Sequence, residues 1–176
     1  MPQERSRPSQ LSFLAPEDAE TLHLMRRFVA EASRLYETRT GRSAESAIRI
    51  GGPTDAYDFL RGEMADLDQE QLRTLNLSVK NQILTAPLIY QGTVANTNVR
   101  VAEVFRPAIL ENAAGLIVAH NHPSGDPTPS SHDVDITRRI VEAGRLLDID
   151  VLDHIIIGHD SYASLRERGL GFDGAR

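Results

Sequence analysis

The sequence predicts an α/β domain in which a mixed β-sheet is flanked by helices. Two short apolar segments, residues 113–119 and 151–157, are typical of central strands that are covered on both faces. Between them, apolar residues recur at three- and four-residue steps from Val134 to Leu147, as in an amphipathic helix. Apolar and polar residues alternate over residues 72–79, as in a half-buried strand. The order of these segments predicts helices packed against a sheet.

The composition limits the chemistry that the chain can perform. It has 176 residues and no cysteine, which excludes disulfides, thiol nucleophiles, iron–sulfur clusters and cysteine-ligated zinc. Any metal site must therefore use His, Asp and Glu. The 25 acidic against 19 basic residues argue against broad nucleic-acid binding. No apolar segment approaches the roughly 20 residues of a membrane span, and the N-terminus lacks a secretory signal, so we expect a cytoplasmic protein.

The N-terminal quarter of the chain differs from the rest. Residues 1–16 are rich in Pro, Ser, Gln and Arg and are predicted to be a disordered leader. Residues 17–47 are predicted to be a helical segment followed by a linker, because a helical period starts at Glu17 and Gly41 follows it. This segment is either a short appendage or part of the core. Residues 48–172 are predicted to form the main domain.

Further elements are predicted ahead of the first apolar segment. A helix is expected over residues 54–64, with Thr54 as its N-cap. Residues 72–79 and 82–90 are expected to form a β-hairpin, whose second strand is an edge or is bulged because it contains Pro87. A helix is also expected over residues 101–112, with its proline tolerated only close to the first turn.

Histidines gather near the end of the first apolar segment, where His120 and His122 follow directly on the predicted strand. Residues i and i+2 of a strand point to the same face, so the two imidazoles can converge on one zinc ion at about 2.0–2.1 Å. A loop stiffened by prolines then leads to Asp133 at the start of the next helix. Two histidines, this aspartate and water would give a tetrahedral zinc with one open position.

Simpler explanations of the same residues remain open at this point. A His-x-His at a strand end is commonly two hydrogen-bonded side chains without a metal. Ser130 and Asp133 have the spacing of a helix capping box, in which the hydroxyl and the carboxylate each bond the other residue's backbone N–H. The spacing alone does not choose between capping and metal binding.

Together these residues resemble a known family. His120, one residue, His122, seven residues, Ser130, two residues and Asp133 reproduce the JAMM (MPN+) metalloprotease motif. The string HNHPSGDPTPS, LDHIIIG at 152–158 and SLRERGL at 164–170 make the chain similar to the RadC branch of that family over about residues 50–170. The resemblance implies the JAMM/MPN fold, which is like that of cytidine deaminases.

The resemblance also implies roles for individual residues. One zinc ion per chain would be held by His120, His122 and Asp133. Ser130 would stabilise the oxyanion beside the metal. A glutamate would take a proton from the zinc-bound water, and we expect Glu103, which opens the predicted helix over 101–112; its alternative role is a favourable charge at a helix N-terminus.

Two more polar residues belong to the RadC-like signature, Asp153 and His154. They are expected to hydrogen-bond the zinc-binding imidazoles on the side away from the metal, or else to brace a neighbouring strand or loop. One departure from the family pattern is Ala102, where RadC-like sequences typically carry arginine.

By resemblance, the chain is a zinc-dependent hydrolase of peptide or isopeptide bonds, acting on a protein or peptide substrate. The alternatives are a non-catalytic MPN-like binding or scaffold module and a DNA-repair-associated protein, as the family name suggests. Residues 1–47 lack the Gly-x-Gly hairpins of the DNA-binding module that RadC-like proteins usually carry. The family's link to DNA is therefore not carried over to this chain.

Overall fold

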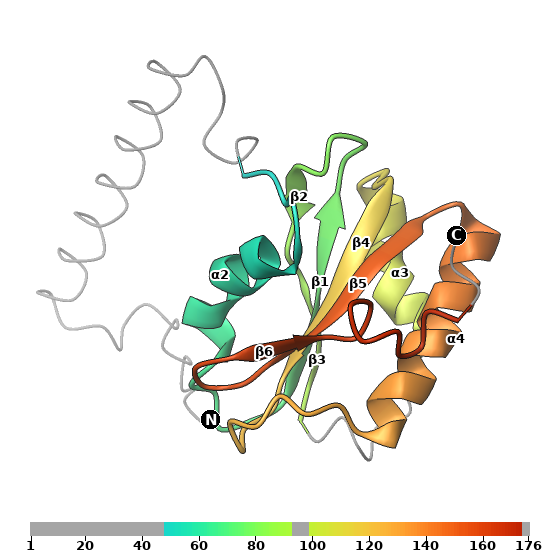
Figure 1. Cartoon of the computed structure of the whole chain (residues 1–176). Coiled ribbons are helices and arrows are strands. Elements are labelled where there is room, and N and C mark those ends of the chain that lie inside the picture. The colour runs from blue at the N-terminus through green and yellow to red at the C-terminus, as the bar shows by residue number, and fades with distance from the viewer. Residues whose placement is uncertain (1–47, 93–98, 174–176) are drawn as a thin grey trace, which may run out of the picture. The chain divides into compact units, whose positions relative to one another are not determined.

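The computed structural model describes residues 48–92 and 99–173 (Figure 1). The predicted leader and the predicted N-terminal helical segment lie outside these residues. The described helices and strands follow one another in this order: α2 (Pro53–Met64), β1 (Gln71–Leu77), β2 (Ile83–Thr85), β3 (Leu88–Gln91), α3 (Val101–Leu110), β4 (Gly115–Asn121), α4 (Ser131–Leu147), β5 (Asp150–Ile157) and β6 (Tyr162–Ser164).

The strands form one mixed sheet in the order β2-β1-β4-β5-β6, with β3 also paired to β1. β4 and β5 are parallel and are joined through α4, whereas β1 runs antiparallel to β4. Every residue of β4 is buried, which confirms the central strand predicted from its continuous apolar sequence. The carboxyl end of β4 therefore meets the start of β1 and the N-terminus of α4 at one edge of the sheet (Figure 1).

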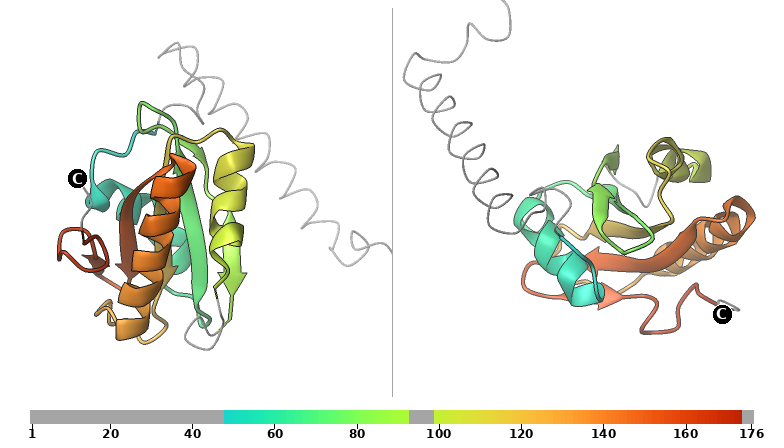
Figure 2. Two further views of the ribbon diagram at one scale, coloured as in Figure 1. Left: turned by 90° about the vertical axis from the view of Figure 1, so that its right-hand side faces the viewer. Right: turned by 90° about the horizontal axis from the view of Figure 1, so that it is seen from above.

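Helices cover both faces of the sheet, as predicted. α3 and α4 lie together on one face, and α2 lies on the other (Figure 2). The first layer packs Phe105 of α3 and Ile140 of α4 against Leu116 of β4. The second packs Leu60 of α2 against Ile117 of β4. Successive residues of β4 thus enter different cores, and this alternation decides which side chains reach the functional site.

Two predicted elements have different bounds in the structure. α2 starts at Pro53 with Gly52 as N-cap, so Thr54 is not the cap; proline is favoured at a first helical position because its φ is preset and its missing N–H has no helical partner there. The second hairpin strand is split into β2 and β3 around Pro87. Pro87 has no N–H, but its carbonyl accepts the backbone N–H of Thr74 (3.3 Å).

One local prediction fails, and one strand was not predicted. Pro107 lies inside α3 rather than near its first turn, and the missing N–H leaves the carbonyl of Glu103 without its helical partner. The helix ends at Leu110, within one turn of that break. β6 was not predicted, because three residues are too few to show an alternating pattern.

No helix in the described part of the chain is long and apolar enough to cross a membrane.

Candidate metal centre

His120 and His122 converge at the carboxyl end of β4, as their spacing predicts. Their Nε2 atoms lie 3.1 Å apart. His120 is buried and His122 is partly buried. The backbone N–H of His122 donates to the carbonyl of Ile157 (2.9 Å), which ties the residue beyond β4 to the end of β5. The two imidazoles are therefore held by the two central parallel strands.

Asp133 returns to the same place from the first turn of α4. Its Oδ1 lies 3.3 Å from Nε2 of His120, and its Oδ2 lies 3.7 Å from Nε2 of His122. Burial of the Asp133 carboxyl opposes ionisation, but the two facing histidines and the hydrogen bonds from Ser130 hold its pKa well below the usual range. Asp133 is therefore a carboxylate, and the structure brings together the three predicted ligands.

The predicted capping box is also present. The backbone N–H of Asp133 donates to Oγ of Ser130 (3.2 Å), and the backbone N–H of Ser130 donates to Oδ2 of Asp133 (2.8 Å). The Ser130 hydroxyl donates to the same Oδ2 (2.6 Å). Capping and metal binding are thus compatible uses of one motif, because the box turns the carboxylate toward the histidines.

A chain of hydrogen bonds fixes the tautomer of His120. The hydroxyl of Thr137 donates to the carbonyl of Asp133, so it accepts from Nδ1–H of His154. Nε2 of His154 is then an acceptor and takes the Nδ1–H of His120 (2.8 Å). Burial lowers the pKa of His154 well below its usual value, which keeps its ring neutral. Nε2 of His120 is left with a lone pair directed at Asp133 and His122.

The tautomer of His122 is fixed in a second way. Its Nδ1–H donates to the carbonyl of Asp126 (2.8 Å) in the loop between β4 and α4. The side chain of Asp126 accepts from the backbone N–H (2.9 Å) and the hydroxyl of Thr128, which holds the loop in shape. In the neutral ring, Nε2 of His122 is therefore also unprotonated; in the protonated ring its Nε2–H would donate to the Asp133 carboxylate, and this bond raises the pKa of His122.

These contacts fit a bound metal ion. Nε2 of His120, Nε2 of His122 and the Asp133 carboxylate face one another at 3.1, 3.3 and 3.7 Å, and in neutral rings whose Nδ1–H groups are bonded as above both Nε2 lone pairs are available to a metal. Ligands placed about 2.0–2.1 Å from a tetrahedral zinc lie about 3.3–3.4 Å from each other. These lone pairs and the carboxylate repel one another, and a divalent cation bound between them would remove that repulsion.

Glu70 joins the group and was not singled out in the sequence. One of its carboxylate oxygens and a ring nitrogen each of His120 and His122 all lie within 4.8 Å of one another. Glu70 precedes β1, and Leu72 of β1 lies opposite His120 of β4, so the antiparallel register puts residue 70 opposite residue 122. The pairing of β1 with β4 is the signal that could have found it.

Comparison with known proteins agrees with this geometry. A family model described as a RadC-like JAB domain matches residues 50–170. The chain belongs to the RadC-like JAB domain family. A UPF0758 protein of Chloroflexus aurantiacus is 54% identical over 136 residues, which are 77% of this chain and 59% of the relative. A UPF0758 protein of Roseiflexus castenholzii is 52% identical over 130 residues, 74% of this chain and 56% of the relative.

A third relative, a UPF0758 protein of Moorella thermoacetica, is 42% identical over 171 residues. That match covers 94% of this chain and 75% of the relative. The chain spans less than two thirds of the length of the first two relatives, 59% and 56%. The family membership and the predicted fold are thereby confirmed, and the group formed by Glu70, His120 and His122 is the candidate metal site of this JAB domain.

Glu103, the expected proton acceptor, is held elsewhere in the JAB domain. Its carboxylate accepts from the hydroxyl of Tyr90 and pairs with the guanidinium of Arg100 (3.0 Å) at the start of α3. Burial and the hydrogen bond to Glu103 raise the pKa of Tyr90. Glu70, not Glu103, is the glutamate grouped with the histidines, and Glu103 takes the helix-terminal position that was its alternative. The arginine that pairs with Glu103 is Arg100, two residues before Ala102, where the family pattern has arginine.

His154 and Asp153 point to opposite faces of β5. His154 supports His120, as expected for a residue behind a metal ligand. Asp153 faces the α2 layer and accepts three hydrogen bonds, from the hydroxyl of Ser164 (2.6 Å) and from the backbone N–H groups of His154 (2.7 Å) and Arg166 (3.2 Å). The expectation that Asp153 bonds the imidazoles is wrong, because neighbouring strand residues alternate between faces; its alternative role, bracing a strand and loop, holds.

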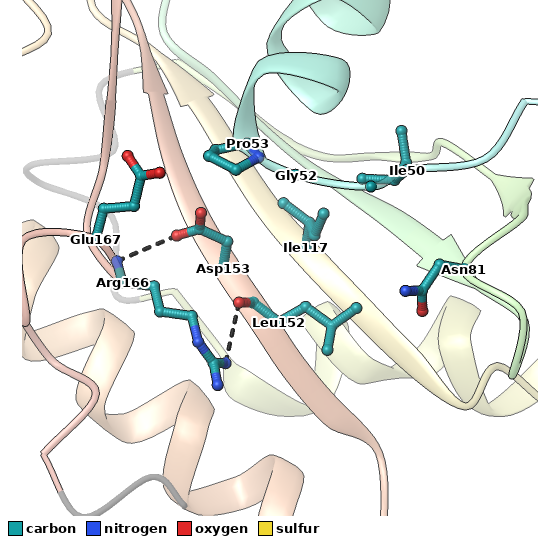
Figure 3. Close-up of a pocket in the computed structure, with 10 residues that line it drawn as sticks. Ile50, Gly52, Pro53, Asn81, Ile117, Leu152, Asp153, Arg166 and Glu167 are labelled. Atoms are coloured by element: carbon teal, nitrogen blue, oxygen red, sulfur yellow. Dashed lines mark hydrogen bonds between the residues drawn. The ribbon is translucent and has the colours of Figure 1, made fainter.

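Two hollows lie near these polar groups. On the α2 face, Asp153 borders a hollow of about 270 Å³, with Pro53 on one side and Leu152 on another (Figure 3). Near the metal centre, a hollow of about 300 Å³ is lined by Asp68, Gln69, Glu70, Gly92 and Pro123. Only the second includes Glu70 and the residue next to His122.

Proposed function

We propose that this JAB domain is a zinc-dependent hydrolase of the JAMM type that cleaves peptide or isopeptide bonds in a cytoplasmic protein or peptide. The observation that carries the proposal is the convergence of the Nε2 atoms of two imidazoles and the Asp133 carboxylate, with Glu70 beside them. A zinc ion held by His120, His122 and Asp133 would act as a Lewis acid and lower the pKa of bound water toward about 7.

Glu70 is the residue best placed to move the proton. Its carboxylate lies next to both histidines, and Glu70 directly precedes β1, so it comes from a different part of the fold from the ligands. We assign to it the role of accepting a proton from the attacking water and passing that proton to the nitrogen of the departing amine. This transfer leaves Glu70 ionised at the end of the cycle, ready for another.

Ser130 has two roles in this proposal. Its hydroxyl donates to Oδ2 of Asp133, which orients the ligand. The family resemblance assigns it oxyanion stabilisation, for which the hydroxyl would turn from the carboxylate toward the substrate oxygen. The two capping bonds, each from a backbone N–H to a side-chain oxygen of the other residue, would persist during this rotation, because neither uses the hydroxyl proton.

The hollow beside Glu70 is the proposed place for the substrate. Its volume of about 300 Å³ is at the lower end of the range of about 300–1,000 Å³ seen for ligand pockets. Glu70 and Pro123 are on its wall, so a chain lying in it would pass next to the proposed zinc ligands. A few residues of an extended peptide would fit there.

The test is metal analysis together with cleavage of peptide and isopeptide libraries. Protein prepared without a His-tag should carry about one zinc per chain and should cleave some members of the library. A chelator should abolish cleavage, and added zinc should restore it. A protein that binds zinc and cleaves nothing would favour the scaffold role, and salt-sensitive DNA binding would favour the DNA-associated role.

A further inference from the structure

The turn that follows β5 packs directly against the loop that leaves the metal centre. The backbone N–H of His122 donates to the carbonyl of Ile157 (2.9 Å), and the backbone N–H of His159 donates to the carbonyl of Gly125 (3.3 Å). Within the loop, the N–H of Gly125 donates to the carbonyl of His122 (2.9 Å). These bonds join the two segments on either side of Gly158.

Gly158 has no room for a side chain. A Cβ built there would lie 2.3 Å from the carbonyl oxygen of Gly125 and 2.9 Å from Cδ of Pro127. The first contact is with backbone, so it cannot be relieved by turning a side chain. The N–H of Gly158 is itself bonded to the carbonyl of Ser161 (2.8 Å), which holds the turn in place. Gly158 therefore permits the loop to approach β5 this closely.

The next peptide of that loop carries the group that fixes His122. The carbonyl of Asp126 directly follows Gly125 in the chain and accepts the Nδ1–H of His122 (2.8 Å). We infer that Gly158 is a positioning residue of the metal centre: by having no side chain, it lets the Gly125–Asp126 backbone sit where it selects the metal-binding tautomer of His122. This inference rests on the proposed metal site.

A substitution at Gly158 should therefore act on His122 without touching it. In Gly158→Ala the carbonyl oxygen of Gly125 must retreat by at least about 0.7 Å to reach the 3.0 Å that real Cβ contacts respect. The Asp126 carbonyl would move with it, and the Nδ1–H of His122 would lose its acceptor. The ring would then populate the Nε2–H tautomer as well, which cannot bind a metal. Loss of such an outer partner typically lowers metal affinity by about 10–100-fold.

The experiment compares Gly158→Ala with Gly62→Ala, a matched control in α2 where a Cβ would meet nothing within 4 Å. Zinc affinity is measured by competition with a chelator, and the tautomer of His122 is read from nitrogen NMR shifts of the metal-free protein. We expect the wild type and Gly62→Ala to show the Nδ1–H form and equal affinity. Gly158→Ala should show mixed tautomers and a 10–100-fold loss. A folded Gly158→Ala with wild-type affinity and tautomer would overturn the inference.

Failure of the proposed function would look different. If the wild type itself bound no zinc, the metal site would be wrong, while the tautomer measurement would still test the contact of Gly158 with the loop. Should Gly158→Ala fail to fold, Pro127→Ala would carry the test, because it leaves Gly158 intact and loosens the same loop. It should weaken zinc binding by a smaller factor, and unchanged affinity and tautomer there would contradict the inference.

Discussion

Asp153 and His154 are neighbours on β5, are both buried, and have opposite uses. On the α2 face, the Asp153 carboxylate accepts three hydrogen bonds from neutral donors within the described domain. On the other face, His154 belongs to a chain of bonds that ends in the lone pairs of the metal site. The difference shows that burial of a polar group does not by itself mark a functional site. Buried acceptors that each have a hydrogen-bond donor stabilise the fold, whereas buried acceptors without donors favour binding of a cation.

Removal of a metal ligand should have the largest effect. His122→Ala deletes one of the three electron-pair donors, so zinc content should fall from about one per chain to almost none, and hydrolysis should disappear with it. Metal analysis of untagged protein measures this. His132→Ala is the matched control, since His132 neighbours Asp133 but is outside the metal group. Stoichiometric zinc in His122→Ala would exclude the proposed ligand set.

The second largest effect should separate the two glutamates. Glu70→Gln should retain zinc and the fold but lower the rate of hydrolysis by about 10²–10⁴-fold, because it removes the proton acceptor. Glu103→Gln should retain most of the rate, since its carboxylate is engaged by Tyr90 and Arg100. Parallel rate and zinc measurements on both variants give the answer. The reverse result would restore Glu103 as the proton acceptor.

His154→Ala should have an intermediate effect. It removes the acceptor for the Nδ1–H of His120, so the tautomer of the ligand is no longer fixed. Zinc affinity should fall by about 10–100-fold, measured by chelator competition on folded protein. Thr137→Val, which keeps the shape and removes the hydroxyl that bonds His154, should lower affinity by a smaller factor. Wild-type affinity in both variants would show that this chain of bonds does not tune the metal.

Asp153→Asn should leave zinc affinity unchanged, because the side chain lies on the other face. Its effect should be on stability against pH. Burial raises the pKa of Asp153 above its usual value, despite the hydrogen bonds that it accepts. The native state therefore holds the proton more tightly than the unfolded chain, so wild-type stability is lost as pH rises from about 3.9 through the raised pKa. Asp153→Asn should flatten that slope in urea unfolding curves, and an identical slope would refute this origin.

The sequence predicts the parts of the site that depend on local spacing. His120 and His122 share a face because they are two residues apart, and Asp133 is turned inward by a capping box that is itself local. Glu70 could not be found in this way, because its place depends on the antiparallel pairing of β1 with β4, about fifty residues further along the chain.

Local patterns also do not show which face of a strand points toward the metal centre. Alternation shows that Asp153 and His154 face opposite ways, but only the packing of α2, α3 and α4 decides which of them reaches the histidines. The prediction for Pro107 was wrong for a similar reason. The free-energy cost of a proline inside a helix depends on how many helical residues follow it. Because α3 ends at Leu110, the lost hydrogen bond disturbs a single turn.

The most direct test of the metal centre is a crystal structure with anomalous data at the zinc absorption edge. It should show one peak per chain, about 2.0–2.1 Å from Nε2 of His120, Nε2 of His122 and an oxygen of Asp133. The fourth position should be open to water, with the Glu70 carboxylate nearby but not bound to the ion. Absence of a peak, or Glu70 occupying that position as a fourth protein ligand, would contradict the hydrolase account.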